Sequence, residues 1–182
     1  RHDVDQILHL AVPALGALPP AEDFRVTTST LLGVLDAARR YAIKRVVIAS
    51  SILVYWGLKG PFDESMALPT TSSIATCAYK KAEEIMGLHF AERAGIDIVF
   101  ARIAYVYGPL YHSLSNTPSR IAHSVARNAA ISGLSPSAED CYDYLYVDDC
   151  AQALVALQTS LNLREKIYNV GAGQPTANAA IL

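Results

Sequence analysis

Two neighbouring hydroxyl side chains, Ser50 and Ser51, end the segment 44–51 after a run of apolar residues. Such a run is typical of a strand that is buried on both faces and has its polar residues at the carboxyl end. Ligands of open α/β sheets bind at that end. The two hydroxyls could therefore form hydrogen bonds to a ligand, but a hydroxyl at a strand end can equally cap the amides of the following loop.

A second set of polar groups, Thr76, Lys80 and Glu84, recurs at intervals of four residues in the segment 72–94. This spacing places a hydroxyl, an ammonium and a carboxylate on one face of a predicted helix. Lys80 and Glu84 could also form an ordinary salt bridge on the helix surface. Tyr79 is the nearest phenol, and because it lies about 100° from Lys80 around the helix, it is expected to pack rather than to react.

The segments around these residues alternate between helix and strand. Helical patterns over 21–41 and 72–94 enclose the strand 44–51, and a second apolar strand follows over 96–103. This order predicts an α/β fold in which a parallel sheet is covered by crossover helices. The packed face of the first helix is expected to contain Phe24, Thr28, Leu31, Leu35 and Ala38.

Shorter elements are expected outside these segments. A strand is predicted over 3–12 and a loop over 13–20. A helix over 117–130 precedes an irregular stretch over 133–140. Asp148 is expected to cap a helix that follows a strand over 143–147, and the last strand is predicted over 166–170.

The composition argues against several classes of protein. The 182 residues are 52% hydrophobic and carry a net charge of −2, which suits one globular core and not the basic surface of a nucleic-acid-binding protein. No apolar run reaches the roughly 18 residues that a membrane span needs. Without such a run or a signal segment, the protein is expected to be cytoplasmic. The three cysteines and the histidines show no metal-ligand spacing, so the thiols are expected to be buried.

Eight short motifs, taken in order, resemble the extended short-chain dehydrogenase/reductases of the NAD-dependent epimerase/dehydratase family. The motifs are His9-Leu-Ala11; Asp23-Phe-Arg-Val with Leu35-Asp-Ala-Ala-Arg39; Lys44 to Ser51 with Val54-Tyr55; Pro61-Phe-Asp-Glu64; Lys80 with Ala82-Glu-Glu84; Arg102 with Val106-Tyr-Gly-Pro109; Tyr146-Val-Asp-Asp149; and Tyr168-Asn-Val-Gly171. Each is weak alone, but their common order across nearly the whole chain makes the resemblance specific.

The resemblance implies a Rossmann-type sheet that binds NAD or NADP. It implies a partial dinucleotide-binding domain over 1–109 and a mixed, substrate-side region over 110–182 within the same globular unit. The family's glycine-rich phosphate turn and its ribose-reading residue lie upstream of the His9-Leu-Ala11 strand and are not in this sequence. The sequence therefore does not distinguish NAD from NADP, and the first strand is expected at an exposed edge of the sheet.

For catalysis, the resemblance implies a tyrosine four residues before a lysine. The phenol acts as the acid/base, and the ammonium lowers its pKa and holds the nicotinamide ribose. Lys80 matches the lysine, but Thr76 occupies the tyrosine position, and an aliphatic hydroxyl is too weak an acid for this role. Ser51 matches the hydroxyl beside the reacting carbonyl, and Tyr79 is the alternative acid.

The resemblance also assigns binding positions. Those on the cofactor side are Leu10, Ala11, Thr27, Ser50, Lys80, Ala104 and Val106. On the substrate side, Tyr105 and Tyr142 stand where the family has an asparagine and an arginine that hold a diphosphate, and a phenol cannot replace an arginine fork. Asn116 and Arg120 match a stretch that lines the nucleotide pocket, although a loop and a helix start explain them equally well.

The principal function expected is that of an NAD(P)-dependent oxidoreductase, epimerase or dehydratase. It would transfer hydride on a sugar nucleotide or another small hydroxylated substrate, through a transient ketone. One alternative is a catalytically silent member that binds cofactor or pairs subunits, and another is an oxidoreductase of a non-nucleotide substrate. The family also implies a homodimer in which the helices 21–41 and 72–94 pair, with Ala37, Tyr41 and Leu88 on their outward faces.

Overall fold

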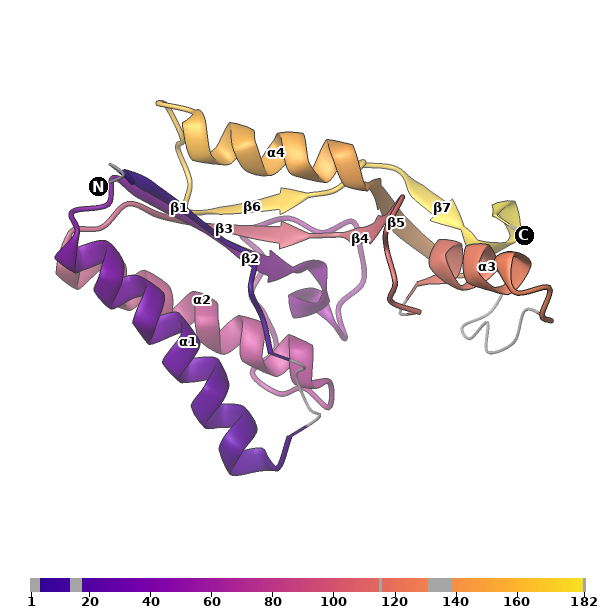
Figure 1. The fold of residues 1–182 in the computed structure, drawn as a ribbon, viewed down its shortest axis with the longest axis horizontal. Helices are drawn as coiled ribbons and strands as arrows, with labels where there is room; N and C mark the ends of the chain where they lie inside the picture. The colour runs from indigo at the N-terminus through magenta and orange to yellow at the C-terminus, as the bar shows by residue number, and fades with distance from the viewer. Residues whose placement is uncertain (1–3, 14–17, 115, 131–138, 182) are drawn as a thin grey trace. The chain divides into compact units, whose positions relative to one another are not determined.

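The computed structural model describes residues 4–13, 18–114, 116–130 and 139–181 of the chain (Figure 1). Its elements are, in order, β1 (Gln6–His9), α1 (Pro20–Arg40), β2 (Arg45–Ser51), η1 (Ile52–Tyr55), α2 (Ala75–Ala94), β3 (Ile98–Ile103), β4 (Tyr105–Tyr107), α3 (Thr117–Ala126), β5 (Cys141–Tyr146), α4 (Val147–Thr159), β6 (Ile167–Val170), β7 (Pro175–Ala177) and η2 (Asn178–Ala180). Most of the stretch expected to be irregular over 133–140 and part of the loop expected over 13–20 lie outside the described residues.

The chain divides into two compact units. Unit 1 contains Arg1–Ile103 and Leu154–Asn169, and unit 2 contains Ala104–Ala153 and Val170–Leu182. This division differs from the expected ranges 1–109 and 110–182, because the chain passes back into unit 1 at Leu154, so that the carboxyl end of α4 belongs to unit 1. Arg45 on β2 holds that end by donating to the carbonyl oxygens of Leu157, at 3.1 Å, and Ser160.

A four-stranded sheet with the order β1-β2-β3-β6 organises unit 1. β1 runs parallel to β2, and β2 runs parallel to β3 with Val46 opposite Ile98 and Ser51 opposite Ile103. The predicted α/β fold, a parallel sheet with flanking helices, is confirmed. β1 lies at the edge of this sheet, as expected, but it is shorter than the strand predicted over 3–12.

The core of unit 1 explains why the apolar runs form strands. The side chains that are at most 1% exposed on the two central strands are Val46, Val47, Ile48, Ile98, Val99, Phe100 and Ala101. Such continuous burial requires cover on both faces of the strands. α1 and α2 lie side by side against the sheet (Figure 1), and α1 contributes Leu31, Leu35 and Ala38 to the core.

The buried face of α1 differs from the expected face at its amino-terminal end. Asp23 and Thr27 are 3% and 2% exposed, whereas Phe24 is 58% exposed and Thr28 directs its hydroxyl to the carbonyl of Phe24. The expectation that Phe24 packs is therefore wrong. The buried stripe runs back from Leu31 in steps of four residues and continues through polar side chains, which an apolar pattern does not reveal.

α2 begins at Ala75, later than expected. The hydroxyl of Ser72 accepts a hydrogen bond from the backbone N–H of Ile74 at 3.1 Å, and this local bond competes with an earlier helix start. Gly95 ends the helix as expected, with a φ of 66°. Gly87 lets α2 approach β3 closely, because a Cβ at this position would lie 2.6 Å from the ring of Phe100.

Large apolar side chains are exposed on α1 and α2. They are Phe24, Leu32, Ile85 and Met86, with 58%, 57%, 70% and 39% of their surface exposed. Tyr41, which follows α1, is exposed as expected. Leu88 packs against the core, so the expectation that it faces outward is wrong.

Unit 2 contains a three-stranded sheet with the order β4-β5-β7, in which β4 is parallel and β7 antiparallel to β5. The sequence did not predict β7, because three residues beginning with a proline form no apolar run. α3 begins at Thr117 as expected and ends earlier, at Ala126. α4 already begins at Val147, so Asp148 lies in its first turn and the capping role expected for it is wrong.

The expectation of buried thiols is only partly correct. Cys77 and Cys150 are buried, but Cys141 is exposed at the start of β5. Over the described ranges, no three His, Cys, Asp or Glu side chains form a group that could hold a metal ion. None of the helices in those ranges combines the length and apolar character that crossing a membrane requires.

Candidate active site

Lys80 brings a positive charge to the carboxyl end of β2. Its ammonium donates to the carbonyl of Ala49 at 2.9 Å and to Oε2 of Glu83 at 2.7 Å. Both charged side chains are only 9% exposed. The alternative explanation of Lys80, a surface salt bridge with Glu84, is therefore wrong, because the partner is Glu83 and the pair is buried.

Glu84 instead pairs with Arg102 on β3. Its two carboxylate oxygens accept hydrogen bonds from Nε and Nη2 of Arg102 at 3.0 and 2.8 Å. Burial lowers the pKa of Arg102, but the bonds to Glu84 and Tyr55 outweigh burial and raise it above its usual value. Ser50 donates its hydroxyl to the same carboxylate at 2.5 Å, so this predicted cofactor position is occupied by a bond within the protein.

Ser51 caps the helical turn η1. Its hydroxyl oxygen accepts a hydrogen bond from the backbone N–H of Leu53 at 3.2 Å. A hydroxyl that accepts in this way still has its own proton to donate. Both interpretations of Ser51 from the sequence therefore fit the structure, and its catalytic role stays a prediction.

Thr76 and Tyr79 occupy different surroundings on α2. Thr76 is half-buried in the first turn, four residues before Lys80. Burial and a hydrogen bond to the carboxylate of Asp23 on α1 raise the pKa of Tyr79. A catalytic phenol needs the opposite shift. The contact with Asp23 supports the expectation that Tyr79 packs, while the role of Thr76 stays a prediction.

His9, at the end of β1, lies near Lys80 and Glu83. Burial lowers the pKa of His9, Glu83 opposes this shift, and Lys80 adds to it. The imidazole is half-buried. With a pKa below its usual value near 6.5, His9 is neutral at pH 7.

Two features at this edge of the sheet fit a dinucleotide. The hydroxyl of Thr27 is buried and has no hydrogen-bond partner among the residues that the structure describes, so a bound ligand could satisfy it. Leu10 and Ala11 follow β1 and are exposed.

The remaining cofactor positions, Ala104 and Val106, belong to unit 2. The backbone N–H of Ala104 donates to the carbonyl of Val170 at 2.9 Å, and the carbonyl of Val106 accepts from the side-chain amide of Asn116 at 2.7 Å.

The substrate-side positions Tyr105 and Tyr142 pack against each other. Their ring centroids are 4.9 Å apart in an edge-to-face arrangement, and Tyr144 lies 6.2 Å from the first ring and 5.9 Å from the second. Burial, together with the two neighbouring phenols, raises the pKa of Tyr105 to about 12. Tyr105 is therefore uncharged at neutral pH. A cluster of phenol rings offers no positive group to a diphosphate.

Asn116 serves the fold of unit 2. It is 5% exposed and caps α3, because its Oδ1 accepts from the backbone N–H of Ser119 at 3.0 Å. Its amide nitrogen donates to Val106. The structure thus supports the helix-start explanation of this residue, and its contact with substrate stays a prediction.

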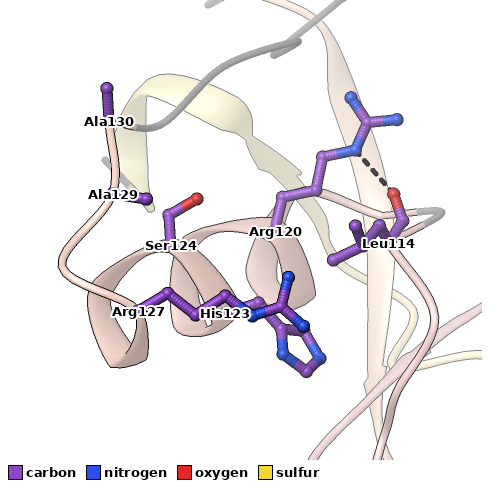
Figure 2. Close-up of a pocket in the computed structure, with 7 residues that line it drawn as sticks. All are labelled: Leu114, Arg120, His123, Ser124, Arg127, Ala129 and Ala130. Atoms are coloured by element: carbon purple, nitrogen blue, oxygen red, sulfur yellow. Dashed lines mark hydrogen bonds between the residues drawn. The ribbon is translucent and has the colours of Figure 1, made fainter.

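Arg120 lines a pocket of about 310 Å³ along α3 (Figure 2). The other lining residues are Leu114, His123, Ser124, Arg127, Ala129 and Ala130. Nε of Arg120 donates to the carbonyl of Leu114 at 2.6 Å, which orients the guanidinium. Two guanidinium groups and an imidazole, without a carboxylate among the described lining residues, suit an anionic group.

Sequence reasoning missed Glu83 and Asp23 as members of the site. Glu83 lies three residues after Lys80, and this spacing allows a pair on a helix just as the spacing of four to Glu84 does. Asp23 lies four residues before Thr27, so the two share a helix face. Only the packing of α1 and α2 shows that these polar positions are buried.

Comparisons with known proteins identify the family of this chain. The model of the NAD dependent epimerase/dehydratase family matches residues 1–171. UDP-glucuronate 4-epimerase of Thermodesulfobacterium geofontis (strain OPF15) is 26% identical over 179 residues, which are 95% of this chain and 53% of the relative. The chain thus spans about half the length of that relative.

Solved structures have the same fold. UDP-N-acetylglucosamine 4-epimerase from Methanobrevibacter ruminantium M1, in complex with UDP-N-acetylmuramic acid, matches with a TM-score of 0.85 and 23% identity over 96% of this chain and 57% of its own. UDP-glucose 4-epimerase from Thermus thermophilus, in complex with NAD, matches with a TM-score of 0.79 and 25% identity over 98% of this chain and 60% of its own.

Proposed function

Because the chain belongs to the NAD-dependent epimerase/dehydratase family, we propose that the complete protein binds NAD or NADP. It uses this cofactor to transfer hydride to and from a sugar nucleotide or another small hydroxylated substrate. The observation that carries the proposal is the ammonium of Lys80, which the carbonyl of Ala49 holds at the carboxyl end of β2. Ligands of parallel sheets bind at that end.

Three residues of this chain would donate hydrogen bonds to the cofactor or the substrate. The nicotinamide supplies the hydride acceptor when it is bound. Lys80 has a remaining N–H donor for a ribose hydroxyl, and Ser51 has a hydroxyl proton for the oxygen of the substrate. The unsatisfied hydroxyl of Thr27 adds a further donor on the cofactor side.

Side chains of unit 2 bear on the class of substrate. The guanidinium groups of Arg120 and Arg127 support a phosphate-bearing substrate. The uncharged pair of Tyr105 and Tyr142 favours a non-nucleotide substrate, because it cannot neutralise a diphosphate. We prefer a sugar nucleotide, with its charge held along α3 and not at the tyrosine pair.

Calorimetry with NAD(H) and NADP(H) tests the cofactor. We expect the complete protein to bind one of them at least about tenfold more tightly than the 182-residue chain, a difference of about 1.4 kcal/mol. The reason is that the glycine-rich turn and its helix amino terminus, which hold the pyrophosphate in such folds, are not in this sequence. Equal affinities of the two proteins, or a complete protein that binds neither cofactor, would contradict the proposal.

A catalytically silent protein is the second candidate. The observation in its favour is Thr76, whose hydroxyl stands at the position of the family's phenol while Tyr79 is bonded to Asp23. A protein of this kind would bind the cofactor and remain inactive with every substrate. Replacing Thr76 by tyrosine distinguishes the two candidates.

The apolar side chains exposed on α1 and α2 support a homodimer formed through these helices. We expect Ile85→Asp to convert the complete protein from dimer to monomer at micromolar concentration, because it places a charge within this apolar surface. Sedimentation velocity measures the change. Val155→Asp on α4, where the side chain is also exposed, should leave the dimer intact. A wild-type protein that sediments as a monomer would rule out the pairing.

A further inference from the structure

The ammonium of Lys80 is held from two sides. The carbonyl of Ala49 accepts one N–H at 2.9 Å, and Oε2 of Glu83 accepts another at 2.7 Å. An ammonium has three N–H donors, so one is left for a ligand. From these contacts we infer that Glu83 is a positioning residue, which fixes Lys80 at the carboxyl end of β2 so that its remaining donor faces a bound ligand.

Burial makes this pairing necessary. The side chains of Lys80 and Glu83 are both 9% exposed, and a buried ammonium needs a counter-charge and hydrogen-bond acceptors. The next carboxylate along α2 is not available, because Glu84 accepts from both Nε and Nη2 of Arg102. Glu83 therefore pairs with Lys80, and the neighbouring Glu84 pairs with Arg102.

His9 completes the surroundings of the pair. Both Lys80 and Glu83 influence its pKa, which places the imidazole near the two charges, and burial leaves it neutral at pH 7. The effects of Lys80 and Glu83 on the pKa of His9 are opposite in direction, as expected for a pair of opposite charges. Without Glu83, the ammonium would keep the Ala49 carbonyl but lose its counter-charge and the contact that fixes its second donor.

The inference rests on the proposed function only for the identity of the ligand, since the pairing can be tested without any cofactor. The test compares Glu83→Ala and Glu83→Gln with the wild type in the complete protein. Acylation by acetic anhydride, followed by mass spectrometry, reports the reactivity of Lys80. Lys81 is an internal control, because it is also buried but donates to the carbonyl of Pro69 at 2.6 Å.

We expect Glu83→Ala to increase the labelling rate of Lys80 by at least about tenfold, the effect of one hydrogen bond to a charged group. The rate of Lys81 should stay the same. Glu83→Gln keeps an acceptor oxygen at the same reach, so its rate for Lys80 should lie closer to that of the wild type. An unchanged rate for Lys80 in Glu83→Ala overturns the inference, and so does an equal increase at Lys81, which would indicate general loosening of α2.

Titration with NADH and NADPH gives the second measurement. For the cofactor that the wild type binds, Glu83→Ala should raise Kd by at least about tenfold and Glu83→Gln by less than about threefold. Glu92→Ala, at an exposed position on α2, should leave Kd unchanged. Equal or tighter binding by Glu83→Ala overturns the positioning role. Faster labelling of Lys80 in a protein whose wild type binds neither cofactor supports the pairing and refutes the proposed function instead.

Discussion

Replacing Thr76 by tyrosine in the complete protein should raise the rate of hydride transfer by about 10²-fold or more, since a positioned acid/base contributes about 10²–10⁴. Thr76 lies four residues before Lys80 on α2, so a phenol there would share a helix face with the ammonium. The ammonium is already held at the carboxyl end of β2. The absorbance of the reduced nicotinamide, followed in a single turnover with a UDP-sugar, measures the rate.

Two variants control for this gain. Thr76→Phe adds a ring of similar size without the hydroxyl, and it should give no increase. Tyr79→Phe should change the rate little, because the phenol of Tyr79 is bonded to Asp23 on the neighbouring helix. If Tyr79→Phe abolishes activity, Tyr79 is the working acid and the role given to position 76 is wrong. If Thr76→Tyr binds the cofactor but is inactive, the hypothesis of a catalytically silent protein is favoured.

The elements of unit 1 could be predicted because their signals are local. The apolar run of β2 and the pattern of α1 each identify an element without knowledge of its neighbours. The orientation of a helix about its own axis depends on what it packs against. Ile85 is 70% exposed on α2 whereas Glu84 is 3% exposed, which is the reverse of their hydropathies. A pattern of residue types could not reveal this reversal, because the partner of Glu84 lies on β3.

The candidate site shows the same limit. The sequence indicated the polar end of β2 and the helix that carries Lys80, and the contact between Lys80 and Ala49 brings them together. It did not indicate which carboxylate pairs with Lys80, because Glu83 and Glu84 are both at helical spacing from it. Arg102 decides which glutamate is left for Lys80. It lies 18 residues from Glu84 in the sequence and donates two hydrogen bonds to the Glu84 carboxylate.

Removing one member of the Arg102–Glu84 pair should lower the stability of the protein strongly. The two side chains are 3% and 4% exposed, so loss of one leaves a buried charge without compensation. We expect Glu84→Leu to reduce the free energy of unfolding by about 3–5 kcal/mol, measured by urea denaturation of the complete protein. This is a large fraction of the roughly 5–15 kcal/mol that stabilises a typical domain.

The double variant Glu84→Leu/Arg102→Met should recover at least half of that loss, because a buried ion pair can be replaced by apolar side chains of similar volume. The phenol of Tyr55 would lose Arg102 but keep Asn169, whose Oδ1 lies 3.0 Å away. Lys44→Ala, which breaks the pair with Asp5 between side chains that are 72% and 57% exposed, should change stability little. A loss below about 1 kcal/mol in Glu84→Leu would mean that burial of this pair contributes no more than a surface contact.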